Sequence, residues 1–220
     1  IEVKNTPAAS SDSVAELALG QMFVLARFIN QANLTMKNGQ WNKKKYTGIE
    51  LTGKKIGIIG MGRIGRALGK RCYALGMKVG YFDSLGKIDG LLDYEALTLD
   101  ELLKTSDFIS IHIPSTEVLI GRNEIEKMKD GVFIVNTARG TVIDSEALLD
   151  ALDSGKIGGA ALDVFVNEPK PDERLVNHEK ISPTPHIGAS TKEAQERIGD
   201  EIVSIVKECF NLEYKEAVLW

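Results

Sequence analysis

The sequence has few of the features that mark disulfide-rich, membrane-spanning or nucleic-acid-binding proteins. Only 2 of the 220 residues are cysteines, and Cys72 and Cys209 lie far apart without metal-binding neighbours. No apolar run approaches the roughly 20 residues of a transmembrane helix, and no signal-peptide pattern opens the chain. The net charge is −4 with acids and bases interspersed, so no basic stripe indicates nucleic acid or an anionic membrane. We therefore expect a cytoplasmic protein with reduced thiols, no metal site, no membrane and no nucleic-acid partner.

From Lys54 onward, short apolar runs alternate with amphipathic stretches. The runs are short enough for strands, whereas the stretches between them repeat apolar residues at helical spacing. Strands that alternate with helices pair in parallel, and right-handed crossovers place helices on both faces of the sheet. The sequence therefore predicts an α/β fold with a doubly wound parallel sheet. The predicted strands cover residues 55–59, 78–82, 108–113, 131–136 and 160–165, the predicted helices cover 63–75, 97–106, 125–130 and 145–154, and 180–188 is predicted to be an irregular connection.

A long helix is predicted before the first strand. Ser13 and Glu16 fit a capping box, and the helix is expected to run to about Lys37, with Gly39 ending it. Residues 17–29 are apolar on nearly every face, which indicates burial against another domain or another subunit. A second capping box at 190–193 predicts a final helix with apolar residues at helical spacing: Ile198, Ile202, Ile205 and Cys209.

A glycine-rich turn follows the first predicted strand. Gly60, Gly62 and Gly65 stand between that strand and a helix, and Asp83 ends the next strand. In this context the three glycines allow a tight turn, close approach of a pyrophosphate and close packing of helix on strand. Asp83 would accept hydrogen bonds from a ribose and repel the extra phosphate of NADP. The turn thus predicts a Rossmann-type domain that binds NAD, the alternative being a tight turn beside a solvated aspartate.

Longer motifs resemble those of one enzyme family, the D-isomer-specific 2-hydroxyacid dehydrogenases. The stretches NTP and SVAELALG come first, and ELTGKKIGIIGMGRIG, MKDGVFIVNTARGTVID, GAALDVFVNEP and TPHIGASTKEAQ follow in that order. They run from Asn5 to about Glu201, which is nearly the whole chain. The KEAQ ending of the last motif leans towards the phosphoglycerate dehydrogenases within this family.

The resemblance implies a catalytic set of Arg139, Glu168 and His186. Histidine suits removal of a hydroxyl proton near neutral pH, a carboxylate would fix its tautomer, and arginine offers a fork for a substrate carboxylate. Without the resemblance, Arg139 could equally pair with Asp144, and Glu168 could be a solvated loop acid. The implied NAD contacts are Gly60, Gly62, Arg63, Ile64, Gly65, Asp83, Ile113, Pro114, Thr137, Ala138, Arg139, Asp163, His186 and Gly188.

The two other histidines are given smaller roles. His178 sits in a polar run and is expected to be exposed, and His112 is expected to be structural or at most near the cofactor. The segment after His112 is a few residues shorter than the equivalent loop of the family. The cofactor contacts that the resemblance implies for Ile113 and Pro114 are therefore less well supported than the others.

The resemblance also implies a domain plan. Residues 1–220 correspond to the NAD-binding domain, with 1–12 and 205–220 as hinge or crossover segments towards a substrate domain that is mostly absent from this sequence. The helix over residues 14–36 would form a homodimer, as it does in the family.

The implied reaction is oxidation of D-3-phosphoglycerate to 3-phosphohydroxypyruvate by hydride transfer to NAD, a step of serine biosynthesis. Two alternatives stay open. One is another dehydrogenase or reductase of the family, acting on glycerate, lactate, glyoxylate or hydroxypyruvate. The other is an NAD-binding module of the corepressor kind, which would bind NADH tightly with negligible turnover.

Overall fold

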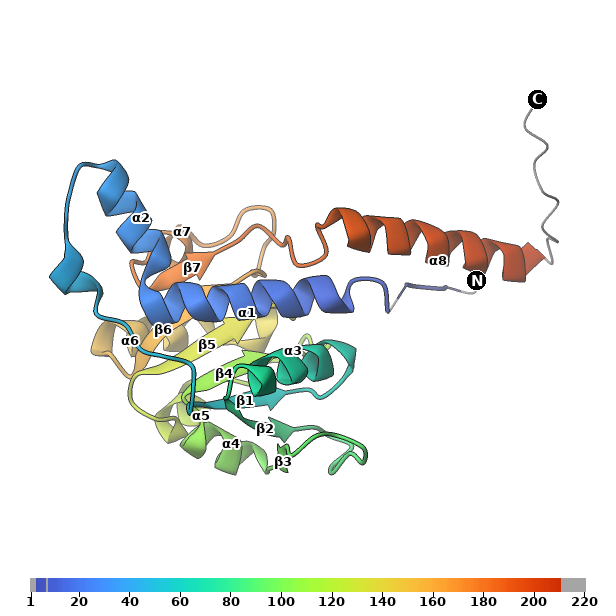
Figure 1. Cartoon of the computed structure of the whole chain (residues 1–220), viewed down its shortest axis with the longest axis horizontal. Helices are drawn as coiled ribbons and strands as arrows, with labels where there is room; N and C mark the ends of the chain where they lie inside the picture. Colours follow the sequence, from blue (N-terminus) through green and yellow to red (C-terminus); the bar gives the residue numbers. More distant parts are fainter. Residues whose placement is uncertain (1–2, 7, 211–220) are drawn as a thin grey trace.

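The protein is built on one parallel sheet of seven strands. The computed structural model describes residues 3–6 and 8–210, and its strands lie in the order β3-β2-β1-β4-β5-β6-β7 (Figure 1). Each neighbouring pair is parallel. This order reverses beside β1, as in doubly wound folds, so the predicted fold class is confirmed. The strands are β1 Lys55–Ile59, β2 Lys78–Phe82, β3 Glu95–Ala96, β4 Phe108–Ile111, β5 Val132–Asn136, β6 Ile157–Leu162 and β7 Ile181–Pro183.

Helices cover both faces of the sheet. Two apolar cores result: α1 and α3 pack on one face, and α4, α5 and α6 pack on the other. Side chains of β1 alternate between these cores, since Ile56 and Ile58 join the first and Ile59 the second. The helices are α1 Ser11–Arg27, α2 Ile29–Lys37, α3 Arg63–Ala74, α4 Leu99–Thr105, α5 Arg122–Lys127, α6 Ser145–Ser154, α7 Glu173–Val176 and α8 Lys192–Phe210, with 3₁₀ turns η1 Lys43–Tyr46 and η2 Gly140–Val142.

The N-terminal helix differs from the prediction in two ways. Phe28 adopts a left-handed backbone (φ 54°) and divides the predicted helix into α1 and α2. The proposed capping box is wrong because both of its side chains bond elsewhere: the Ser13 hydroxyl donates to Gly188 O, and Glu16 pairs with Arg71. Phe23 is 37% exposed, so the helix is not buried on every face within this chain.

The prediction also missed short elements near the C-terminal end of the chain. Residues 181–183 form strand β7 although the segment was predicted to be irregular, and β6 lies about three residues earlier than expected. The second proposed capping box is wrong: Thr191 rather than Ser190 accepts the Ala194 N–H at the start of α8, and an alanine at this position cannot reach back as a glutamate would. Prolines at 183 and 185 hide the strand pattern.

Helix α8 and the described residues before α1 leave the sheet on the same side (Figure 1). Arg197 Nε donates to Ala9 O at 2.8 Å, which ties α8 to this N-terminal segment. Of the predicted hinge segments, residues 1–2, 7 and 211–220 lie outside the described residues. Within the described part of the chain, no helix has the length and apolarity required to cross a membrane.

Candidate active site

The carboxyl ends of the strands bring the predicted site residues to one edge of the sheet. Ile59 is in register with Phe82 and Ile111, and the same row continues through β5 and β6 to β7. Parallel strands end at the same edge, where ligands of doubly wound folds bind. The next residue of each strand in this row therefore lies at that edge: Gly60, Asp83, His112, Thr137, Asp163 and Thr184.

The three glycines each serve the turn in a different way. Gly60 has φ +93°, and a Cβ there would lie 2.6 Å from His112 O. Gly65 is buried against the Gly60 carbonyl, so a side chain at this position would separate α3 from β1. Gly62 is the N-cap of α3 and has nothing within 4 Å of its Cβ position. This open side, next to the free N–H groups of the first helical turn that includes Arg63 and Ile64, fits an approaching pyrophosphate.

Asp83 accepts hydrogen bonds from two backbone N–H groups of the chain itself. Its carboxylate accepts the Met61 N–H at 2.8 Å and the Leu85 N–H at 3.0 Å. The aspartate thereby holds the glycine turn against the end of β2. A carboxylate can accept about four hydrogen bonds, so capacity remains for ribose hydroxyls.

A cleft of about 620 Å³ joins these groups. It contains five of the predicted cofactor residues, and its volume suits a cofactor-sized ligand. The open space beside Gly62 and the N-terminus of α3, which favours anions, fit the pyrophosphate of NAD. Its walls are Ile59, Gly60, Gly62, Phe82, Asp83, Ser84, Leu85, His112, Ile113, Pro114, Ser115 and Leu119, of which the sequence had not singled out Ile59, Phe82, Ser84, Leu85, Ser115 and Leu119.

His112 bridges two strand ends inside this cleft. Its Nε2 lies 2.9 Å from Ser110 Oγ, and its Nδ1 lies 3.3 Å from Thr137 Oγ1. Burial lowers the pKa of His112 to about 4, so the ring is neutral at physiological pH. A neutral imidazole has one donor and one acceptor nitrogen and can serve both hydroxyls. This placement agrees with the prediction of a structural residue near the cofactor.

Asn136 shapes the loop that presents Arg139. Asn136 is buried, its amide donates to Arg139 O at 2.9 Å, and its Oδ1 accepts the Ala138 N–H at 3.0 Å. The Arg139 side chain is exposed beside this loop. Asp144 caps α6 through the Ala147 N–H instead of serving as an arginine partner. Sequence reasoning did not single out Asn136.

His186 and Glu168 form a hydrogen-bonded pair. His186 Nδ1 lies 2.8 Å from Glu168 Oε2, and Glu168 Oε1 accepts the Phe165 N–H at 2.8 Å. Burial raises the pKa of Glu168, but bonds from His186 and Phe165, together with the charges of His186 and Arg139, lower it overall. In the neutral form of the ring, a carboxylate at Nδ1 favours the tautomer with its proton on Nδ1 and its lone pair on Nε2. The structure thus brings these two predicted residues together, and the charge of Arg139 contributes to the lowered pKa of the carboxylate.

The loop of His186 is held by the buried Asp163. His186 has φ 53°, a left-handed conformation that costs a non-glycine residue about 1–2 kcal/mol. Both Asp163 oxygens accept bonds from this loop, from Thr184 Oγ1, Ile187 N and Gly188 N. The predicted cofactor contact Asp163 therefore has a positioning role that the sequence had not indicated.

His178 is more enclosed than predicted. Its side chain is 13% exposed and lies 3.3 Å from Asp153. It also accepts the Lys180 N–H, so the expectation of a freely exposed residue is wrong. Its polar neighbours in sequence did not reveal these contacts.

Comparison with known proteins identifies related chains. Residues 19–188 match the family described as D-isomer specific 2-hydroxyacid dehydrogenase, NAD binding domain. A hydroxypyruvate reductase of Thermotoga maritima is 51% identical over 209 residues, covering 92% of this chain and 68% of that protein. A D-3-phosphoglycerate dehydrogenase of Homo sapiens is 47% identical over 207 residues, covering 92% of this chain but 39% of that protein.

Solved structures show the same similarity. An NAD-dependent formate dehydrogenase from Staphylococcus aureus, in complex with NAD, has a TM-score of 0.85 at 31% identity. The match covers 94% of this chain and 65% of that one. The chain therefore spans about two thirds of some relatives' length and about two fifths of others'.

Proposed function

The chain belongs to the D-isomer specific 2-hydroxyacid dehydrogenase family, and from this premise we propose that it acts in NAD-dependent oxidation of a D-2-hydroxy acid. The observation that carries the proposal is the His186–Glu168 pair, 2.8 Å apart, at the edge of the sheet where the NAD-binding cleft opens. A solvated loop acid would not explain why Glu168 accepts bonds from both His186 and the Phe165 N–H.

Each catalytic side chain has a defined task in this reaction. The free Nε2 of His186 accepts the hydroxyl proton of the substrate, and Glu168 stabilises the imidazolium that forms. Arg139 binds the substrate carboxylate through its planar fork. The cofactor, when bound, supplies the hydride acceptor at its nicotinamide ring. In the reverse direction His186 returns the proton to the oxygen of a 2-oxo acid.

The cofactor is held by the glycine turn and Asp83. The start of α3, with Gly62, Arg63 and Ile64, favours the anionic pyrophosphate. Asp83 keeps its remaining lone pairs for the ribose hydroxyls and disfavours a phosphate at that position. Ile113 and Pro114 supply apolar walls of the same cleft. Thr137, Ala138, Asp163 and Gly188 would line the nicotinamide end.

We propose D-3-phosphoglycerate as the substrate, to be oxidised to 3-phosphohydroxypyruvate in the cytoplasm. The GASTKEAQ motif and the 47% identical human relative support this choice. Hydroxypyruvate reduction is the second candidate, because the 51% identical Thermotoga maritima relative carries that name. Both candidates require the same three catalytic residues and differ in the group on the carbon next to the reacting one.

Titration calorimetry with NADH and NADPH tests the binding part of this proposal. We expect tight NADH binding and weak NADPH binding.

Turnover is then followed by loss of NADH absorbance with phosphohydroxypyruvate and, separately, with hydroxypyruvate. Faster reduction of the phosphorylated acid supports the first candidate, and the reverse supports the second. Tight NADH binding without turnover of either acid, using this chain joined to its substrate domain, would favour a binding module over an enzyme.

We also propose that α1 and α2 form a homodimer. Several large apolar side chains of this region are exposed: Phe23 (37%), Ile29 (46%), Leu34 (61%), Met36 (52%) and Trp41 (78%). Such a patch is typical of an interface between subunits. Sedimentation equilibrium should give a dimer, and Leu34→Glu should shift it towards the monomer. A monomeric wild-type chain at micromolar concentration would refute this proposal.

Residues 1–12 and 205–220 are proposed to connect this domain to a substrate domain. The proposal is supported by the bond from Arg197 Nε to Ala9 O, which ties the helix leading into the second segment to the first segment. The exposed apolar residues of α8, Ile202, Val203 and Val206, would pack against that domain.

A further inference from the structure

The loop that carries Glu168 has little packing of its own. Residues 163–172 lie between β6 and α7 without helix or strand, and residues 166–170 are exposed. A cavity of about 310 Å³ lies against the loop, with Pro169, Pro171 and Val176 among its walls. Asp163 and Val164 are buried and Phe165 packs against the core, whereas core contacts hold residues 166–170 only weakly. The position of these exposed residues therefore depends on how the two ends of the loop are fixed.

The first end is fixed by a close backbone contact. A Cβ at Gly140 would lie 2.5 Å from Phe165 Cα, so the turn after Arg139 rests directly on the start of the Glu168 loop. The backbone of Phe165 in turn donates its N–H to Glu168. This contact sets one end of the loop but leaves the segment after Pro169 unconstrained.

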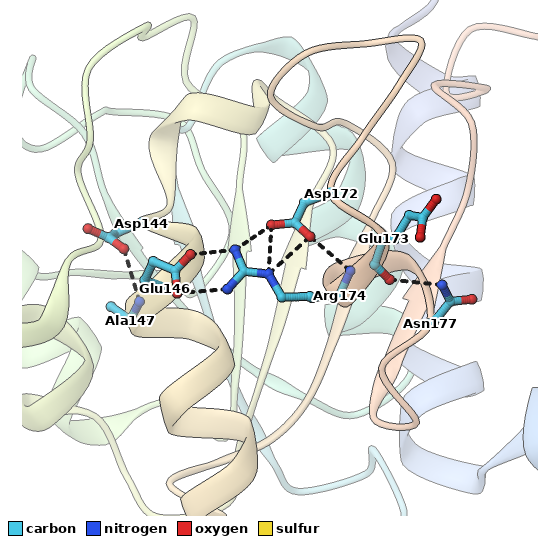
Figure 2. A network of polar contacts seen from close by, with 7 residues as sticks. All are labelled: Asp144, Glu146, Ala147, Asp172, Glu173, Arg174 and Asn177. Atoms are coloured by element: carbon cyan, nitrogen blue, oxygen red, sulfur yellow. Dashed lines mark hydrogen bonds and ion pairs between the residues drawn. The ribbon is translucent and has the colours of Figure 1, made fainter.

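The second end is fixed by Arg174, on the single turn of α7. Figure 2 shows its guanidinium lying between the carboxylates of Asp172 and Glu146. Arg174 Nε lies 3.2 and 3.1 Å from the two Asp172 oxygens, and Nη1 lies 3.1 Å from Glu146 Oε2. Its Nη2 bonds both carboxylates. The buried Leu175 anchors α7 to the core, and the fork of Arg174 sets how this turn is rotated.

Glu146 connects this arrangement to the Arg139 loop. It stands in the first turn of α6, the helix that follows η2 and is capped by Asp144 (Figure 2). Arg174 therefore joins the segment after Glu168 to the segment after Arg139. Two loops that carry catalytic side chains are fixed relative to each other at this point.

The energetic contribution of these ion pairs does not explain the arrangement. Arg174 and Glu146 are 58% and 66% exposed, and exposed ion pairs typically contribute about 0–1 kcal/mol. Their geometric effect is larger, because bidentate contacts on both sides fix the plane of the guanidinium. We propose that Arg174 is a positioning residue for the Glu168–His186 pair. The inference rests on the proposed function only in that this pair is the catalytic one.

Nitrogen NMR of the histidine rings tests this inference. The ¹⁵N shifts of a neutral imidazole report which nitrogen carries the proton, and His186 shares the chain with only two other histidines, His112 and His178. At alkaline pH we expect the Nδ1–H form of His186 in the wild type. Glu168→Ala, which removes the carboxylate and leaves no acceptor in its place, defines the full shift towards the Nε2–H form.

Arg174→Gln and Glu146→Gln should each move the His186 signals part of the way towards those of Glu168→Ala. The matched control is Arg122→Gln, which breaks another exposed ion pair: Arg122 of α5 lies 2.6 Å from Asp150 of α6. This control should leave the His186 signals unchanged. Wild-type signals in both test variants, or an equal shift in the control, would overturn the proposal. Failure of the proposed function would instead appear as absent NADH binding or turnover, which this spectrum does not measure.

Discussion

Replacement of Gly140 by alanine tests the contact between the two catalytic loops most directly. The new Cβ would lie 2.5 Å from Phe165 Cα, and still closer to the Phe165 carbonyl carbon and Val166 N. Ordinary carbon–carbon contacts are about 3.5–4.0 Å, and the neighbours are backbone atoms that cannot rotate away. The loop must therefore move, or the fold must accept strain.

The size of the effect follows from known overpacking. Inserting one carbon into a filled site typically costs about 1–3 kcal/mol of unfolding free energy. For a chain of this length, 1 kcal/mol corresponds to roughly 2–4 °C in Tm. We expect Gly140→Ala to lower Tm by roughly 2–12 °C in a thermal unfolding scan. If Phe165 moves to relieve the strain, the His186 nitrogen signals should also shift.

A second glycine supplies the control. Gly199, in α8, is exposed and has nothing within 4 Å of its Cβ position. Alanine is favoured over glycine inside a helix by about 0.5–1 kcal/mol, so Gly199→Ala should leave Tm unchanged or slightly raised. A Gly140→Ala chain with wild-type Tm and wild-type His186 signals would show that the described contact does not exist.

Three further predictions concern single side chains. Asp83→Ala removes the acceptor of the Met61 N–H and of the ribose, so NADH affinity should fall at least about tenfold in calorimetry, with a smaller loss for NADPH; equal affinities to wild type would remove the role given to Asp83. Burial holds the pKa of His112 at about 4, below its unfolded value of about 6.5. Between about pH 6.5 and pH 4 the unfolded chain binds a proton at His112 that the folded chain does not, so the free energy of unfolding falls as the pH falls through this range. His112→Gln should remove this pH dependence from denaturant unfolding measured at a series of pH values. The pKa of Glu168 is lowered on folding, so its carboxylate contributes to the free energy of unfolding above about pH 4.3, and this contribution is lost below that pH. Glu168→Gln should therefore reduce the loss of stability in the acidic range. An unchanged curve of unfolding free energy against pH would contradict the pairing with His186.

Asp163 illustrates how one buried side chain can organise a site. Its two oxygens accept three bonds from the His186 loop, and its backbone carbonyl accepts the His186 N–H at 2.8 Å. These bonds compensate for the left-handed conformation of His186. The imidazole is thus held in place although its side chain is 54% exposed.

The sequence by itself determined the layered fold and most of the candidate site. The runs of β1 and β2, the glycines that follow and the helical spacing of α6 are local patterns, and each is set by backbone preferences within a few residues. The glycine turn after the first strand and the acid at the end of the next strand also predicted Asp83 as a partner of the cofactor ribose. The family motifs then added Arg139, Glu168 and His186.

Only the tertiary structure decided which polar groups are partners. Ser13 fits a local capping box, yet its hydroxyl donates to Gly188 O, 175 residues away. Arg174 finds Glu146 across 28 residues, and this ion pair leaves no periodic trace in the sequence. A side chain with several possible hydrogen-bond partners takes the one that packing brings within about 3 Å. Packing depends on the whole chain at once, so these choices could not be derived from local sequence.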